Sequence, residues 1–269
     1  MSALRELCED VEVLVPRPYI PHLLASYVPR WHAYAGAMPH EVREGISVYR
    51  PACLQLPRIG RALWLDRSAF LCCRRTARAM HGRMGFDALL SFDLLGAGGV
   101  AWRIGQHLGI PAAGWATGDD VRVPASSPYG RVVRRAMQRL DLVFYQSREL
   151  LDKGAALLGV TPDGIACERH RILPRGIPTP PALHRSETRK RVRAEWGVTD
   201  DQLVILSIGR MTREKGVFEL LDAIARVVPR DARAICLLLG SLPAFDESAA
   251  IRKKLDATPR LRERVRLLP

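Results

Sequence analysis

Short apolar runs alternate with amphipathic helical patterns along most of the chain, and this alternation restricts the fold more than any other feature. The runs contain few polar residues, which is typical of strands buried on both faces of a parallel sheet. They lie at 11–15, 87–91, 110–115, 141–145, 203–208 and 234–239. The helical patterns lie at 97–107, 129–140, 147–158, 215–228 and 247–255. This repetition predicts an α/β fold with right-handed crossover connections.

Local signals support two of the predicted helices. In the pattern at 215–228, positions 217, 220, 221, 224, 227 and 228 are all apolar. Their spacing places them on one face of a helix. In the pattern at 147–158, Ser147 follows a predicted strand directly and can cap the first turn.

A proline-rich segment at 178–188, PTPPALHRSET, interrupts the α/β pattern. Three prolines within four positions disfavour both a helix and a central strand. The segment predicts a linker between a longer N-terminal domain, 1–177, and a shorter C-terminal domain, 189–269. Residues 16–60 are rich in proline and irregular, so the sequence does not place their elements.

The composition is that of an ordinary globular protein and excludes several other classes. Apolar residues make up 48% of the chain and charged residues 26%, which argues against disorder. No stretch approaches the ~20 consecutive apolar residues of a transmembrane helix. The N-terminus is charged where a secretion signal has an apolar run. The six cysteines form no CxxC pair, so we expect reduced thiols and a cytoplasmic protein.

The net charge of +13 is compatible with an anionic substrate, an anionic membrane or a nucleic acid. No RNA-binding signature or zinc-finger spacing accompanies the charge, so we expect no nucleic-acid partner and no metal site. Four arginines, Arg131, Arg134, Arg135 and Arg139, form one stripe of a predicted helix. Such a stripe is either a solvated face or a peripheral contact with anionic lipid at the inner face of the membrane.

The most specific segment is LVILSIGRMTREKG at 203–216, where a predicted strand runs through a polar turn into an amphipathic helix. Arg210 offers a planar fork of donors, and Lys215 offers a mobile positive charge. Gly209 and Gly216 allow a ligand to approach the backbone close to the positive end of the helix. The segment therefore suits a diphosphate. The alternative is a tight strand-to-helix turn whose basic residues are only solvated.

This segment, with the strand and glycine ICLLLG at 235–240, resembles the start of the C-terminal domain of family 4 glycosyltransferases. Upstream, the sequences GIP at 109–111, DLV at 141–143, QS at 146–147 and LPRGI at 173–177 are similar to that family's N-terminal domain in order and spacing. The resemblance covers about residues 85–269. It implies an α/β, GT-B-like fold with two Rossmann-like domains, an acceptor-side domain at 1–177 and a nucleotide-sugar-binding domain from 189.

The resemblance also implies a function. The expected activity is transfer of a sugar from a nucleotide-diphosphate donor, with retention of configuration, to a carbohydrate, lipid or other small acceptor. Arg210 and Lys215 match the family residues that bind the donor diphosphate, and Gly209, Gly216 and Gly240 match its donor-loop glycines. No cofactor is expected besides the nucleotide-sugar substrate. An epimerase of sugar nucleotides on the same architecture is an alternative.

Three departures from the family pattern stand out. The family's first strand and glycine-rich loop have no counterpart, because the sequence starts in what resembles the end of the first helix, 3–8. The sequence ends in what resembles the third strand of the C-terminal domain, 265–269, so that domain is expected to be about half present. A paired-glutamate motif is therefore missing. We expect the isolated chain to be inactive and prone to self-association; a non-catalytic remnant of such an enzyme is the other interpretation.

The third departure concerns the acceptor side. Many relatives have a histidine soon after the segment matching Pro111, whereas this chain has Thr117, Gly118, Asp119 and Asp120 there. Asp119 and Asp120 either bind hydroxyl groups of the acceptor or close a loop.

Overall fold

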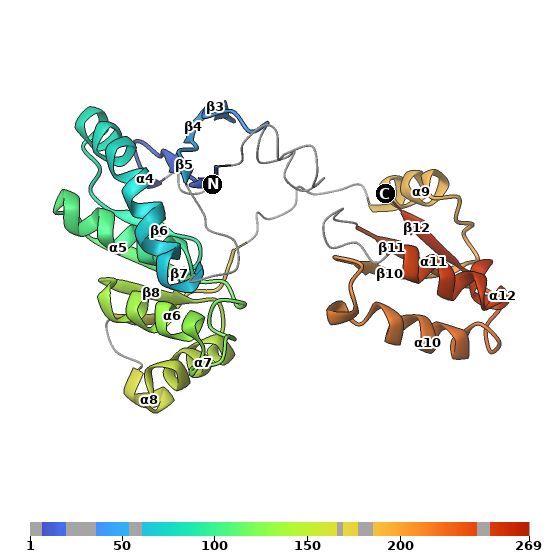
Figure 1. The fold of residues 1–269 in the computed structure, drawn as a ribbon. Helices are drawn as coiled ribbons and strands as arrows, with labels where there is room; N and C mark the ends of the chain where they lie inside the picture. The colour runs from blue at the N-terminus through green and yellow to red at the C-terminus, as the bar shows by residue number, and fades with distance from the viewer. Residues whose placement is uncertain are drawn as a thin grey trace. The chain divides into compact units, whose positions relative to one another are not determined.

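The computed structural model describes residues 7–19, 36–53, 61–165, 169–176, 185–240 and 248–268. The chain divides into two compact units, 1–177 and 178–269, and each contains parallel strands and helices (Figure 1). The first part of the predicted linker, 178–184, lies outside the described residues. Its last part was predicted wrongly, because helix α9 (Arg185–Glu195) already begins there.

The first unit is built on a parallel sheet of four strands in the order β6-β7-β8-β9 (Leu89–Ser91, Ala112–Ala116, Leu142–Tyr145, His170–Ile172). The crossovers run through α5 (Ala97–Leu108), α6 (Pro128–Arg139) and α7 (Arg148–Leu158). Helix α8 (Pro162–Ile165) follows α7. Because the strand order follows the sequence, right-handed crossovers bring these helices to one face of the sheet. Their apolar sides pack there on Ala112, Ala116, Val143 and Tyr145.

The rest of the first unit contains short strands, and the sequence predicted one of them, at 11–15. Strands β1 (Val13–Leu14), β4 (Ile46–Tyr49) and β3 (His40–Arg43) form one small sheet, and β2 (Arg17–Pro18) pairs with β5 (Ala52–Cys53). Glu44 and Gly45, both with positive φ, make the tight turn between β3 and β4. The predicted strand 11–15 is shorter in the structure, where it corresponds to the two residues of β1.

The 24-residue helix α4 (Arg61–Met84) was also missed. It buries mainly small side chains, Ala69, Cys73 and Ala77, against Val100 and Ile104 of α5 and Cys53 of β5. Small residues give a weak apolar periodicity, which explains why the pattern does not stand out in the sequence.

The second unit has a parallel sheet in the order β10-β11-β12 (Leu203–Ile208, Ala234–Leu239, Val265–Leu268). Between the strands lie the short 3₁₀ helix η1 (Arg213–Lys215) and the helices α10 (Val217–Val227), α11 (Ser248–Asp256) and α12 (Pro259–Arg262). The apolar face of α10 packs with α11 and α12 on one face of the sheet. Val198 and Trp196, just after α9, contact Ile235 and Leu237 on the other.

Burial differs between neighbouring strands in this unit. β11 is buried along almost its whole length, as its uninterrupted apolar run predicts. The same prediction was wrong for β10, where Leu206 and Ile208 are 43% and 71% exposed. β10 has one strand neighbour among the described residues, whereas β11 lies between two.

Candidate functional site

A hollow opens at the carboxyl end of β10 and β11 in the second unit. Two cationic side chains, Arg210 and Lys215, line it together with polar and apolar neighbours: Ser207, Ile208, Gly209, Met211, Val217, Leu238 and Leu239. The carboxyl edge of a parallel sheet is where α/β folds bind ligands, because the strand-to-helix turns gather there. The structure therefore brings both predicted diphosphate-binding residues to one place.

Two glycines fix the shape of this edge. A Cβ on Gly240 would come within 2.6 Å of the carbonyl oxygen of Gly209, so the backbones after β10 and β11 touch at this point. Gly216 has a φ of 72° and is both the C-cap of η1 and the N-cap of α10. An L-residue side chain is strained in that conformation, so glycine allows the abrupt change from one helix to the next.

The electrostatics of the hollow favour an anion. Lys215 is exposed and makes no ion pair with the residues that the structure describes, and Arg210 is half-buried. The N-terminus of α10 begins at Gly216, where no side chain caps the free backbone N–H groups. These N–H groups carry the positive end of the helix dipole. Two cations and a helix N-terminus therefore surround the same opening.

The neighbouring arginine, Arg213, belongs to a different environment. Its guanidinium lies over the Phe218 ring, 4.5 Å from the centroid, and it does not line the hollow. Lys254 approaches the same ring and makes an ion pair of 2.7 Å with Asp222. Of the three basic residues in this turn, Arg210 and Lys215 therefore line the hollow, whereas Arg213 packs on Phe218.

The size of the hollow limits what it can hold. Its volume of about 220 Å³ is below the ~300–1,000 Å³ of typical small-molecule pockets. It therefore suits one charged group of a ligand better than a whole nucleotide sugar.

Burial raises the pKa of Cys236, on β11, to about 11, so this thiol stays protonated at neutral pH.

Sequence reasoning missed Thr212, in the turn between β10 and η1. Thr212 is buried, and its hydroxyl has no hydrogen-bond partner among the described residues. Buried hydroxyl groups without a hydrogen-bond partner are rare in proteins, so the Thr212 hydroxyl is an unusual feature of this turn. A threonine in a polar turn gives no sequence signal for this, because burial depends on the tertiary packing.

The first unit contains the other predicted residues, Asp119 and Asp120, in the turn after β7. Asp120 is buried, and its carboxylate accepts hydrogen bonds from four backbone N–H groups. These belong to Leu94 (2.9 Å), Thr117 (3.2 Å), Gly118 (2.9 Å) and Val121 (3.0 Å). These contacts match the loop-closing alternative for Asp120. Asp119 is exposed, so its carboxylate is accessible to a ligand.

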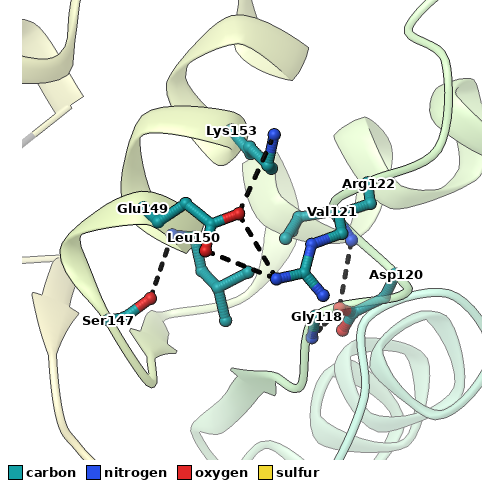
Figure 2. Close-up of polar contacts among 8 residues, drawn as sticks. All are labelled: Gly118, Asp120, Val121, Arg122, Ser147, Glu149, Leu150 and Lys153. Carbon is teal, nitrogen blue, oxygen red and sulfur yellow. Dashed lines mark hydrogen bonds and ion pairs between the residues drawn. The ribbon is translucent and has the colours of Figure 1, made fainter. Parts of the chain in front are cut away.

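Charged side chains flank this turn at the start of α7 (Figure 2). Arg122 donates to Glu149 at 3.3 Å, and Lys153 lies 3.9 Å from the same carboxylate. Ser147 caps α7 by accepting from the backbone N–H of Leu150, as the sequence predicts. The turns after β7 and β8 are therefore linked by side chains from both.

The described residues contain no group of three or more potential metal ligands, and none of their helices is long and apolar enough to cross a membrane. The predicted site residues divide between the two units: Gly209, Arg210, Lys215, Gly216 and Gly240 gather in the second, and Asp119 and Asp120 lie in the first.

Several known proteins resemble this chain. TuaC of Bacillus subtilis, whose name assigns it to teichuronic acid biosynthesis as a glycosyltransferase, is 27% identical over 231 residues. HepE from Anabaena, solved in complex with UDP, matches with a TM-score of 0.60 and 15% identity over 95% of this chain. A UDP-forming α,α-trehalose-phosphate synthase from Burkholderia xenovorans matches with a TM-score of 0.59 and 14% identity over 96%. No protein-family model matches.

The chain spans 56% of TuaC, 60% of HepE and 73% of the trehalose-phosphate synthase. The structural matches are low in sequence identity and establish the fold. Together with the parallel sheets of both units, they show that this chain has a GT-B-like α/β fold with two Rossmann-like units.

Proposed function

We propose that this chain is part of a glycosyltransferase and that the hollow at the end of β10 binds the diphosphate of a nucleotide-sugar donor. The observation that carries the proposal is the convergence of Arg210, Lys215 and the uncapped N-terminus of α10 on one opening. Each of these groups favours an anion, and a diphosphate is small enough for the hollow.

The proposed chemistry is departure of the nucleoside diphosphate from the sugar carbon. Negative charge develops on the leaving phosphate oxygen, and the guanidinium of Arg210 and the ammonium of Lys215 stabilise that charge. Because these side chains supply the positive charge, the proposal includes no resident metal or cofactor. We propose retention of configuration from the family resemblance, and we assign the acceptor to the first unit, where the exposed Asp119 is the candidate contact.

The similar proteins support a uridine nucleotide. HepE was solved with UDP, and the trehalose-phosphate synthase is UDP-forming. TuaC, the similar protein with the higher sequence identity, is named as a glycosyltransferase. We therefore propose UDP-sugar as the donor class and leave the acceptor as a carbohydrate, a lipid or another small molecule.

Calorimetric titration of the 269-residue chain with UDP tests the donor site directly. We expect UDP to bind, and Arg210→Ala and Lys215→Ala each to weaken binding by about tenfold or more, the usual effect of losing one charged hydrogen bond. Arg213→Ala is the matched control, because it removes the same charge from the same turn outside the hollow.

Two results would contradict the proposal. One is UDP binding that none of the three substitutions changes. The other is an equal loss in all three variants, since that would mean that UDP responds to the net charge of the turn and not to the hollow.

A further inference from the structure

The exposed face of α4 has an unusual arrangement of charge. Arg67, Arg74, Arg75 and Arg78 are all exposed, and they surround Leu71, which is 53% exposed. At 3.6 residues per turn these five positions fall within about 100° of the helix circumference. The stripe from residue 67 to 78 is about 16 Å long at 1.5 Å per residue. We call it the α4 arginine stripe.

Nothing in the described part of the chain neutralises the α4 arginine stripe. None of its four arginines makes an ion pair with a described residue, although other surface arginines such as Arg148 do. The one acidic residue of α4, Asp66, is buried and paired with Arg103 of α5 at 2.9 Å. The stripe is therefore a local concentration of positive charge around an exposed leucine.

The stripe differs from the one that the sequence suggested on α6. There Arg134 donates to the carbonyl oxygen of Leu157 at 2.7 Å and serves the packing of α7. Arg131, Arg135 and Arg139 remain exposed on α6, which packs beside α4. Both neighbouring helices therefore carry exposed arginines that make no ion pair with a described residue, and α4 also carries the exposed Leu71 among its arginines.

We propose that the α4 arginine stripe docks the protein on an anionic lipid membrane. Charge complementarity selects the partner: a sheet of anionic headgroups can neutralise four arginines at once, and Leu71 can enter the boundary between headgroups and acyl chains. Long arginine side chains suit this position, since their stems lie along apolar surface while the guanidinium stays at the headgroups. The α4 arginine stripe contains a leucine and no aromatic side chain, whereas sites for single-stranded nucleic acids use aromatic side chains on which the bases stack.

Vesicle flotation of the full chain tests the proposal. We expect the protein to float with vesicles of phosphatidylcholine and phosphatidylglycerol but not with phosphatidylcholine alone. Replacement of Arg67, Arg74, Arg75 and Arg78 together by Gln should weaken binding by at least about a hundredfold, since each charge near the surface contributes about fivefold. Leu71→Ser should weaken binding by about tenfold with the charge unchanged.

The matched control removes the same four charges elsewhere, by replacing Arg189, Lys190, Arg191 and Arg252, all exposed in the second unit, with Gln. It should retain most of the binding. If the fourfold variant of the stripe does not fold by circular dichroism, the double variants Arg67/Arg78 and Arg74/Arg75 replace it, each with a loss of about 25-fold.

The proposal is wrong if the stripe and control variants lose equal affinity, which would indicate a net-charge effect, or if the wild-type chain does not float. It is also wrong if a single-stranded RNA, but not the vesicles, binds with a dependence on these four arginines. The proposal does not depend on the donor site, because the UDP titration and the flotation use different residues.

Discussion

The carboxylate of Asp120 accepts a hydrogen bond of 2.9 Å from the backbone N–H of Leu94, so one buried side chain joins the turn after β7 to the turn after β6. Within its own turn the same carboxylate accepts from the N–H groups of Gly118 and Val121 (Figure 2). These hydrogen bonds hold the turn that also carries the exposed Asp119, the residue that we propose as an acceptor contact.

Removing the Asp120 carboxylate should destabilise the first unit. Asp120→Ala leaves several backbone N–H groups buried without an acceptor, and we expect a loss of about 2–4 kcal/mol in the free energy of unfolding. Urea denaturation measures the loss, and hydrogen exchange of the peptides around residues 94 and 118 should locate it. Asp119→Asn is the control, because an exposed substitution changes stability by no more than about 0.5 kcal/mol. An equal effect of both substitutions would contradict a stabilising role of the hydrogen bonds that Asp120 accepts.

The contact between Gly209 and Gly240 predicts a strong effect of a single methyl group. Gly240→Ala places a Cβ 2.6 Å from the Gly209 carbonyl oxygen and at a φ of 119°. We expect the second unit to lose about 1–3 kcal/mol of stability and to lose UDP binding, because the ends of β10 and β11 must separate. Faster hydrogen exchange in β10 and β11 and calorimetry with UDP measure the two effects.

Gly82→Ala is the control for the glycine prediction. A Cβ on Gly82 meets nothing within 4 Å, so the alanine should raise helix stability by about 0.5–1 kcal/mol. A Gly240→Ala variant with unchanged exchange and unchanged UDP binding would show that the close approach has no consequence.

We expect His170 to make the stability of the first unit depend on pH. Burial, assisted by the positive charge of Arg169, lowers the pKa of His170, and its Nδ1 lies 2.9 Å from the Tyr145 hydroxyl. The unfolded chain, with a histidine pKa of about 6.5, therefore binds a proton more readily than the folded chain. The stability that neutral His170 contributes is complete above that value and is lost as the pH falls below it.

We expect the free energy of unfolding to decrease between about pH 7.5 and about pH 5.5, and His170→Gln to reduce that decrease. Urea denaturation of both proteins across this range measures the difference. An identical pH dependence in the two proteins would assign the effect to other groups.

The cap of α7 should contribute a modest and measurable stability. Ser147→Ala removes the acceptor of the Leu150 N–H at 3.3 Å, and we expect a loss of about 1 kcal/mol, the usual value for such a cap. Ser126→Ala, at an exposed position outside any helix, should be neutral. Thermal or urea unfolding of the two variants side by side separates a cap effect from a general effect of serine loss.

The amino-acid sequence by itself determined the repeated α/β units and the place of the cationic turn. Apolar runs such as 234–239 and amphipathic patterns such as 217–227 depend on the periodicity of neighbouring residues, so they can be read locally. The position of Arg210 and Lys215 at the carboxyl edge follows from the strand before them, since a parallel strand must end where its crossover helix begins.

The tertiary structure decided the features that depend on distant partners. It showed that Asp120 is enclosed by backbone N–H groups while its neighbour Asp119 is exposed, although both are aspartates of one turn. It also revealed α4, whose buried side is made mainly of small residues, and the exposure of Ile208 on a strand that is almost as apolar as buried β11. Burial is set by the elements that pack on a residue, and these come from parts of the chain far away in sequence.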